Sequence, residues 1–306
     1  MKIAVTGATG FIGRYIIKAL LAQGHDIVVV GRSAPAEDHR LTFIRSDLLA
    51  RDNYSWIADH RPSHLLHLAW YAEHGKFWTS PLNLDWCDVT VRLTAAFCEY
   101  GGERIVIAGS CAEYDWSFGY CREEITPINP TTLYGIAKDS ARRMAERICQ
   151  THRVSFAWGR IFFPFGPGEH TQRLIPSVAH ALLGWRPPFA INTQHWRDFL
   201  PVESIAAGFV FLLNQKVSGV FNICSGRPTQ LSELIRYLGT VLDKDPAPLL
   251  ARTVHQKDIP HFLVGDNTVL LNIGWQPKYD LWDSLQYYAK SIAETQDYAE
   301  ATLRKL

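Results

Sequence analysis

Tyr134 and Lys138 are the side chains whose types and spacing most directly suggest chemistry. They stand four positions apart, so in a helix they lie on one face, one turn apart. A phenol has a pKa of about 10, and a nearby ammonium lowers that pKa because its charge favours the phenolate. Such a pair can exchange a proton with a substrate oxygen near neutral pH. The same spacing is also common on ordinary helix surfaces.

Ser110 is a third candidate, because it follows an apolar run at residues 104–108. At the carboxyl end of a strand, its hydroxyl could bind the oxygen of a substrate carbonyl or alcohol. The alternative is a turn serine that bonds its own backbone.

The segment Thr6–Gly13 is rich in glycine and lies between an apolar run and a helical pattern. This context predicts a turn that binds the pyrophosphate of a dinucleotide, although a plain turn would look similar. Gly7 allows the tight turn, Gly10 lets backbone N–H groups approach the phosphates, and Gly13 lets the helix pack on the strand. The predicted cofactor-binding residues of this segment are Gly7, Thr9, Gly10, Phe11, Ile12 and Gly13.

The end of the second apolar run predicts which dinucleotide binds. It reads Gly31-Arg32-Ser33, with no carboxylate before Glu37. An acidic residue there would bind the 2′-hydroxyl of NAD, whereas an arginine accommodates the 2′-phosphate of NADP. Arg32 and Ser33 therefore favour NADP over NAD, unless Arg32 is an ordinary exposed arginine. The other predicted cofactor contacts are Asp47, Leu48, Leu68, Ala69, Tyr134 and Lys138.

Asp47 has two equally good interpretations. Its carboxylate could accept a hydrogen bond from the adenine amino group, or it could cap the helix that follows.

The elements that position these residues alternate between strand and helix, which predicts an α/β fold with a doubly wound parallel (Rossmann) sheet. After about residue 163 the rhythm changes, and residues 163–168 look like a stiff loop. We predict a smaller, non-contiguous C-terminal α/β lobe that binds the substrate. The NADP-binding domain would comprise residues 1–163 and about 202–226, and the substrate lobe about 164–201 and 227–306. The predicted strands are 3–5, 26–30, 42–44, 64–69, 104–108, 154–162 and 220–223, and the predicted helices are 83–100, 134–150, 175–183, 204–213, 231–242 and 281–293.

Composition excludes several classes of protein. The 306 residues carry a net charge of +1 and 20% charged residues, so attraction to nucleic acid or an anionic membrane is not indicated. No apolar run approaches the roughly 18 residues of a membrane span, and no signal peptide is visible. The six cysteines form no C-x-x-C pair and the histidines show no metal spacing. A cytoplasmic protein without a metal site is expected.

The chain as a whole resembles the extended short-chain dehydrogenase/reductase family, in its sugar-nucleotide epimerase/dehydratase/reductase group. The resemblance runs from residue 6 to residue 277. It implies that Ser110, Tyr134 and Lys138 are the catalytic triad and that Lys138 also holds the nicotinamide ribose. The matching motifs are Thr6–Gly13, Ser110 with Tyr134-x-x-x-Lys138, residues 160–168, Arg197-Asp198-Phe199 and Gly274-Trp275-Gln276-Pro277.

The resemblance also implies a nucleoside-diphosphate sugar as substrate, with Arg197 on its diphosphate unless Arg197 pairs with Asp198. The expected assembly is a homodimer joined by a four-helix bundle of the helices at 83–100 and 134–150. Aromatic residues near the sheet edge could stack on a sugar or a base. The predicted substrate-binding residues are Trp70, Cys111, Glu113, Arg173 and Arg197.

One departure from the family pattern narrows the reaction. Dehydratases of this group carry Asp-Glu directly after the triad hydroxyl, where this chain has Cys111-Ala112, so dehydration is not expected. The hypothesis is NADPH-dependent reduction of a nucleotide-linked 4-keto-6-deoxyhexose to the 4-hydroxy sugar. The alternatives are an NAD(P)-dependent nucleotide-sugar 4-epimerase, a reductase of a non-nucleotide carbonyl, and a catalytically idle NADP-binding sensor.

Overall fold

The computed structural model describes residues 1–50, 54–254 and 259–303, with side chains described to residue 295. Within them, seven parallel strands form the central sheet in the order β11-β7-β5-β4-β1-β2-β3. This confirms the Rossmann-like α/β fold. The strands are β1 (Lys2–Thr6), β2 (Asp26–Gly31), β3 (Leu41–Arg45), β4 (His64–His67), β5 (Arg104–Ser110), β7 (Ser155–Ile161) and β11 (Gly219–Ile223).

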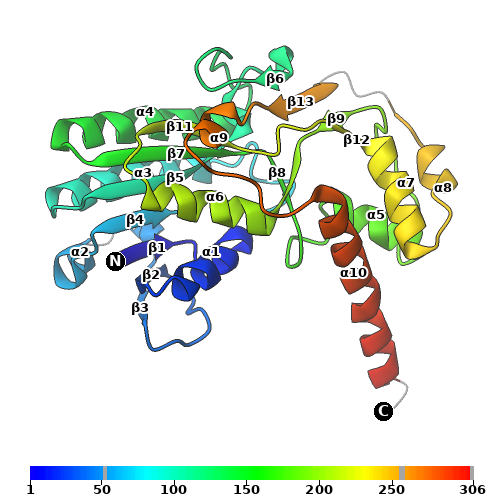
Figure 1. Cartoon of the computed structure of the whole chain (residues 1–306), viewed down its shortest axis with the longest axis horizontal. Helices are drawn as coiled ribbons and strands as arrows, with labels where there is room; N and C mark the ends of the chain where they lie inside the picture. Colours follow the sequence, from blue (N-terminus) through cyan, green and yellow to red (C-terminus); the bar gives the residue numbers. More distant parts are fainter. Residues whose placement is uncertain (51–53, 255–258, 304–306) are drawn as a thin grey trace.

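The strands of this sheet are continuous apolar runs because helices cover both faces. Helices α1 (Phe11–Ala22) and α6 (Val202–Asn214) lie on one face, and α3 (Leu82–Glu99) and α4 (Leu133–His152) lie on the other (Figure 1). The separate apolar cores on the two faces account for the absence of alternation in these strands. The short helix α2 (Ser55–His60) joins α3 and α4 on their face.

A buried hydrogen-bond chain attaches α3 to the middle of the sheet. His67 Nδ1 lies 2.6 Å from Thr6 Oγ1 and its Nε2 lies 2.9 Å from Thr90 Oγ1. Burial lowers the pKa of His67 to about 3, so the imidazole is neutral at physiological pH. This histidine links β1, β4 and α3 close to the edge where the Gly-rich turn begins.

Apart from α6, β11 and the helix at residues 268–272, which pack with the central sheet, the elements after residue 163 build a second region, which Figure 1 shows beside the carboxyl end of the sheet. Here β8 (Phe163–Phe165) pairs with β10 (Phe199–Pro201), and β9 (Trp196–Arg197) pairs with β12 (Thr229–Gln230) and β13 (Phe262–Gly265). Strand β13 also pairs with β6 (Tyr120–Cys121). The remaining helices are α5 (Leu174–Leu182), α7 (Leu231–Leu242), α8 (Ala247–Leu250), α9 (Thr268–Asn272) and α10 (Leu281–Leu303).

Two expectations about these elements were wrong. Residues 163–165 are a strand rather than a loop, because the chain pairs in parallel with Phe199–Pro201. The last helix runs ten residues past its expected end at 293, to Leu303. The helices predicted at 83–100, 134–150, 175–183, 204–213 and 231–242 are confirmed to within two residues at each end.

Candidate active site

Ser110 and Tyr134 meet because a glycine lets two elements approach closely. Ser110 ends β5 and caps the 3-10 helix Cys111–Glu113, where its Oγ accepts a hydrogen bond from the N–H of Ala112 (3.2 Å). A Cβ at Gly135 would overlap the carbonyl oxygen of Ala112, so only glycine lets the first turn of α4 approach this 3-10 helix so closely. Thr132 caps α4 by accepting from the N–H of Gly135 (3.1 Å). The backbone bond expected for a turn serine is therefore present.

Tyr134 is enclosed by aromatic rings. Its ring packs edge-on against Phe77, Trp78 and Trp70, at centroid distances of 4.9, 5.7 and 6.3 Å. Its N–H donates to the carbonyl oxygen of Trp78 (3.1 Å). This environment raises the pKa of Tyr134 above its ordinary value through burial, which a side-chain hydrogen bond with Ser110 only partly offsets.

The expected lowering of the Tyr134 pKa is therefore wrong for this structure, because burial outweighs every effect that would lower it. The Lys138 ammonium lies 6.0 Å from the Tyr134 ring centroid and 3.8 Å from that of Trp70. It donates to the carbonyl oxygen of Ala108 (2.8 Å). Burial lowers the pKa of Lys138 to about 7, against a smaller opposing effect of the Glu113 carboxylate. The phenol of Tyr134 is thus protonated at neutral pH and can act as an acid.

Glu113 cannot contact a substrate, which corrects its assignment from the sequence. Its side chain is 0% exposed. One carboxylate oxygen accepts from the N–H of Ser110 (2.7 Å) and from Nε1 of Trp158 (2.9 Å). The other accepts from Nε of Arg160 (2.7 Å), which forms a buried ion pair. Glu113 therefore fixes the backbone of Ser110 through the hydrogen bond from its N–H. The neighbouring Cys111 is buried, and burial raises the pKa of its thiol.

The Gly-rich turn has the shape that a pyrophosphate site requires. Gly7 has φ +72°, and a Cβ at Gly13 would overlap the carbonyl oxygen of Gly7, so both positions require glycine. Gly10 is the N-cap of α1 and makes no side-chain cap bond. The exposed Thr9 and the half-buried Phe11 and Ile12 flank this helix end. Free backbone N–H groups at a helix N-terminus fit the anionic phosphates of a dinucleotide.

The other predicted cofactor residues lie along the same edge of the sheet. Arg32 and Ser33 are exposed directly after β2. The N–H of Ser46 donates to the carbonyl oxygen of Gly31 (3.0 Å), so the segment ending β3 lies beside them. Asp47 Oδ1 accepts from the N–H of Leu49 (3.1 Å), which confirms the capping interpretation. Contact of these residues with adenosine stays a prediction.

Behind the turn, Leu68 and Ala69 support Gly7. A Cβ at Gly7 would lie 2.7 Å from the nitrogen of Ala69, and that nitrogen also donates to Thr6 Oγ1 (3.3 Å). Leu48 is buried in the apolar core on the α3 and α4 face of the sheet. These residues shape the turn, and their contacts with a cofactor stay predictions.

Arg197 is a buried arginine, 6% exposed, whose described partners are neutral. Its guanidinium donates to the carbonyl oxygens of Trp196 (2.7 Å) and His261 (3.3 Å) and to Nδ1 of His195 (3.1 Å). Among the described residues no carboxylate pairs with it. Burial lowers the pKa of Arg197 to about 10.

The alternative that Arg197 pairs with Asp198 is wrong. Asp198 instead accepts from the N–H and Oγ of Ser225 (2.7 and 2.6 Å) and from the N–H groups of Gly226 (3.0 Å) and Gly265 (3.2 Å). Asp198 holds backbone turns together, and the Arg197 guanidinium retains donors that an anion can use.

Arg173 lies between the Gly-rich turn and Tyr134. It precedes α5 as its N-cap, and its guanidinium is 5.8 Å from the ring of Phe11. It is held by Glu169 (3.1 Å) and by the carbonyl oxygen of Pro164 (2.9 Å). Its charge is among the effects that lower the pKa of Tyr134. The structure thus places Arg173 near both Phe11 of the Gly-rich turn and Tyr134.

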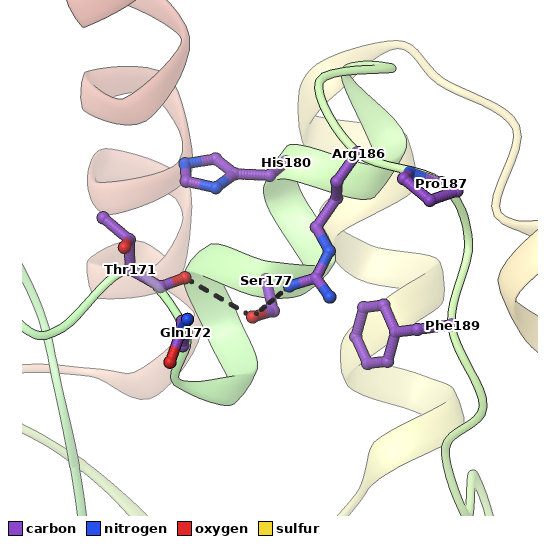
Figure 2. Close-up of a pocket in the computed structure, with 7 residues that line it drawn as sticks. All are labelled: Thr171, Gln172, Ser177, His180, Arg186, Pro187 and Phe189. Carbon is purple, nitrogen blue, oxygen red and sulfur yellow. Dashed lines mark hydrogen bonds between the residues drawn. The ribbon is translucent and has the colours of Figure 1, made fainter. Parts of the chain in front are cut away.

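A cavity of about 570 Å³ opens beside α5, between the turn that presents Arg173 and the segment that leads to Arg197. Figure 2 shows its polar centre, where Arg186 donates to Ser177 Oγ (2.9 Å). The Arg186 guanidinium also lies 4.6 Å from the ring of Phe189. The lining residues are Thr171, Gln172, Ser177, His180, Arg186, Pro187 and Phe189.

Sequence reasoning missed Phe77 and Asn83. Phe77 lies in an irregular loop, and Asn83 lies at the start of α3, where it looks like an ordinary polar residue.

None of the helices in the described part of the chain has the length and apolar character of a membrane span. The same residues contain no group of three or more His, Cys, Asp or Glu side chains arranged for a metal.

The fold and this site define a class: Rossmann-fold enzymes with a Ser, Tyr and Lys cluster at the carboxyl edge of the sheet. The sequence model described as the NAD dependent epimerase/dehydratase family matches residues 3–224. The chain belongs to this family, as the sequence motifs predicted.

The three similar proteins described next are each less than 30% identical to this chain. The chain is 28% identical over 237 residues to dTDP-6-deoxy-L-talose 4-dehydrogenase (NAD(+)) of Aggregatibacter actinomycetemcomitans, covering 76% of this chain and 87% of that protein. It is 24% identical to GDP-6-deoxy-D-mannose reductase of Pseudomonas aeruginosa, covering 93% and 95%. UDP-N-acetylglucosamine 4-epimerase from Methanobrevibacter ruminantium M1, solved with UDP-N-acetylmuramic acid, shares the fold with a TM-score of 0.84 and 21% identity, covering 96% and 98%.

Proposed function

We propose that this protein reduces the 4-keto group of a nucleotide-linked 6-deoxyhexose to the 4-hydroxy sugar, with NADPH as reductant. The observation that carries the proposal is the arrangement of the site, in which Ser110 ends β5 beside the Tyr134 and Lys138 side chains of α4. A protonated Tyr134 phenol is the form that can donate a proton during reduction. Glu113 is held in its ion pair and positions 111 and 112 are Cys and Ala, so the three positions after Ser110 offer no free carboxylate as a second acid or base.

In this mechanism the Ser110 hydroxyl and the Tyr134 phenol bind the carbonyl oxygen of the substrate. The dinucleotide, when bound at the Gly-rich turn, supplies the hydride for the carbonyl carbon. Tyr134 donates its proton to the oxygen as negative charge develops there, which completes the secondary alcohol. The Lys138 ammonium would stabilise the resulting phenolate and hold the nicotinamide ribose of a bound dinucleotide.

The aromatic wall beside Tyr134 supports a 6-deoxy sugar. Phe77 and Trp78 present apolar rings to the site, and Trp116 packs edge-on against Trp78 at 5.9 Å. Apolar rings suit the C6 methyl of a deoxyhexose better than a polar C6 substituent. The relatives from Aggregatibacter and Pseudomonas are both named for 6-deoxy sugars.

For the nucleotide part of the substrate, we assign Arg197 and Arg173 to the diphosphate. A planar fork of donors matches phosphate oxygens, and Arg197 is already desolvated. The cavity in Figure 2 lies between the segments that carry these two arginines, and we assign it to the nucleobase end. Its Arg186 and Phe189 offer a hydrogen-bonding fork and an aromatic face.

The second candidate is a nucleotide-sugar 4-epimerase, favoured by the fold shared with the Methanobrevibacter enzyme. One assay separates the two. Purified protein is mixed with a 4-keto-6-deoxy sugar nucleotide, and NADPH or NADH oxidation is followed together with product formation. Reduction requires one molecule of NADPH per product, whereas conversion of a 4-hydroxy sugar nucleotide to its epimer without net cofactor use would overturn our proposal.

Arg32 carries the proposed preference for NADP. We expect Arg32→Ala to raise the KM for NADPH by about 10- to 150-fold, because a charge-assisted hydrogen bond to phosphate contributes about 1.5–3 kcal/mol. The KM for NADH should change by no more than about twofold, since NADH lacks the 2′-phosphate. Steady-state kinetics with both cofactors measure this, with Arg236→Ala on α7 as the control. The Aggregatibacter relative is named for NAD(+), and equal effects on both cofactors would favour NAD here as well.

We further propose that residues 1–163 with about 202–226 bind the cofactor, and that about 164–201 and 227–306 bind the substrate.

We also propose that the outward faces of α3 and α4 join two copies of the chain in a four-helix bundle. Leu84, Ile136 and Met144 on these helices are 60%, 48% and 44% exposed, which leaves apolar surface for such an interface. Sedimentation at micromolar concentration should give a dimer, and Met144→Glu should shift it to monomer. A monomeric wild-type protein would contradict the assembly.

A further inference from the structure

Asn83 joins two parts of the active-site wall through one buried amide. Its side chain is 0% exposed, at the start of α3. The amide oxygen accepts from Nε1 of Trp70 (2.9 Å). The amide nitrogen donates to the carbonyl oxygens of Phe77 (2.7 Å) and Ser80 (2.9 Å). Because the amide itself is fully buried and all three bonds are made, it fixes the Trp70 ring and the turn that carries Phe77 and Trp78 in one arrangement.

The Trp70 ring held in this way faces the catalytic lysine. The Lys138 ammonium lies 3.8 Å from the ring centroid, well within the range of a cation–π contact. Trp86, which lies on α3, stacks on Trp70 with the ring centroids 6.5 Å apart and an interplanar angle of 30°. Lys138 is 3% exposed, and within the described residues its ammonium donates to the Ala108 carbonyl and forms no ion pair. The ring face is thus a major source of stabilisation for this buried charge.

We propose that Trp70, oriented by Asn83, is a positioning residue that holds the Lys138 ammonium charged and in place for the nicotinamide ribose and for Tyr134. The inference rests on the proposed reductase mechanism, in which Lys138 acts as a cation. Trp70 therefore contributes to catalysis through Lys138, in addition to the direct substrate contact predicted for it from the sequence. Asn83 acts on Lys138 indirectly, because its amide fixes the orientation of the Trp70 indole.

Burial is the effect on Lys138 that Trp70 must offset, whereas the Glu113 carboxylate favours the ammonium. His67 on β4 is neutral, and Lys138 is among the causes that lower the pKa of this histidine. Tyr134 lies on the same helix, with its ring centroid 6.0 Å from the ammonium. Since burial already lowers the pKa of Lys138 to about 7, a small change in its surroundings alters its charge in the physiological range.

Trp70→Leu is the decisive variant, because leucine keeps the site apolar but has no π face. Loss of the cation–π contact should lower the pKa of Lys138 by about one, which corresponds to about 1.4 kcal/mol and lies within the range for such contacts. We expect kcat/KM at pH 7.5 to fall about tenfold and to recover partly at lower pH, where the amine is protonated again. Trp70→Phe keeps a ring face but loses the hydrogen bond from Nε1 to Asn83, so its effect should be smaller than that of Trp70→Leu and similar to that of Asn83→Ala.

The titration of Lys138 is measured directly by NMR of lysine-labelled protein, with Lys138→Met to assign its signal. This readout needs neither substrate nor turnover, so it tests the positioning role even if the proposed reaction fails. Asn83→Ala should shift the same titration in the direction of Trp70→Leu, by a smaller amount. Trp86→Leu is the matched control, because it removes a ring that stacks on Trp70 but does not face Lys138.

The proposal is overturned if Trp70→Leu leaves both the Lys138 titration and the pH profile unchanged. It is equally overturned if Trp86→Leu reproduces the full effect, since that would indicate general loosening of the core. Circular dichroism and melting curves accompany each variant. If Trp70→Leu does not fold, Asn83→Ala decides, because it keeps the indole and removes only the amide that orients it. An unchanged Lys138 titration in Asn83→Ala would then overturn the proposal.

Discussion

Tyr134→Phe should lower kcat for reduction of the keto sugar by about 100- to 10,000-fold, the usual contribution of a general acid. The change removes only the phenolic hydroxyl and keeps the ring that packs against Phe77, Trp78 and Trp70. Folding and cofactor binding should therefore persist. Single-turnover reduction under saturating NADPH measures the effect on the chemical step.

Tyr237→Phe is the matched control, because Tyr237 also donates through its hydroxyl, to the carbonyl oxygen of Trp282, but lies on α7. Its kcat should stay within about twofold of the wild type. Unchanged turnover in Tyr134→Phe would show that another group supplies the proton and would contradict the mechanism. Loss of turnover together with loss of NADPH binding would instead indicate a structural role for the hydroxyl.

The sequence predicted those parts of the site that depend on local pattern. The spacing of Tyr134 and Lys138 placed both on one helix, and α4 indeed begins one residue before Tyr134. The apolar runs predicted the parallel strands, because strands covered on both faces lack alternation. The positions of Gly7 and Gly13 in the turn follow from steric contacts within a short segment.

Interactions between distant segments could not be predicted in the same way. Glu113 looked available beside Ser110, but Arg160 and Trp158 on β7, more than forty positions along the chain, occupy its carboxylate. The sign of the Tyr134 pKa shift depends on burial by Phe77 and Trp78, which lie in a loop with no periodic pattern. The spacing of residues along the chain predicts which side chains are close together on one helix. The burial of those side chains depends instead on which loop packs against the helix.

The role of Arg197 could be predicted from the sequence only in part. Its motif with Asp198 suggested either an anion site or an internal ion pair, and only the packing decided between them. Asp198 is fully used by the backbone N–H groups of Gly226 and Gly265 and by Ser225. A residue pair that is adjacent in sequence therefore points to two different tasks, because successive residues of an extended segment face opposite sides.

Arg197→Met should raise the KM for the nucleotide sugar by about 10- to 150-fold, which corresponds to the loss of about 1.5–3 kcal/mol of charge-assisted hydrogen bonding. Methionine keeps most of the apolar length of the side chain and removes the donors. Since the diphosphate does not change during reduction, Arg197 binds substrate and transition state alike, and kcat should fall by less than about tenfold.

Calorimetric binding of the nucleoside diphosphate alone separates this effect from the chemistry. Its affinity should fall in parallel with the rise in KM, because the diphosphate carries the contact. Arg227→Met, at an exposed arginine of the same region, should leave both quantities within about twofold. If Arg197→Met leaves KM and diphosphate affinity unchanged, the substrate carries no diphosphate at this position. The reductase of a non-nucleotide carbonyl then becomes the better description, because Tyr134 chemistry would persist without the anion site.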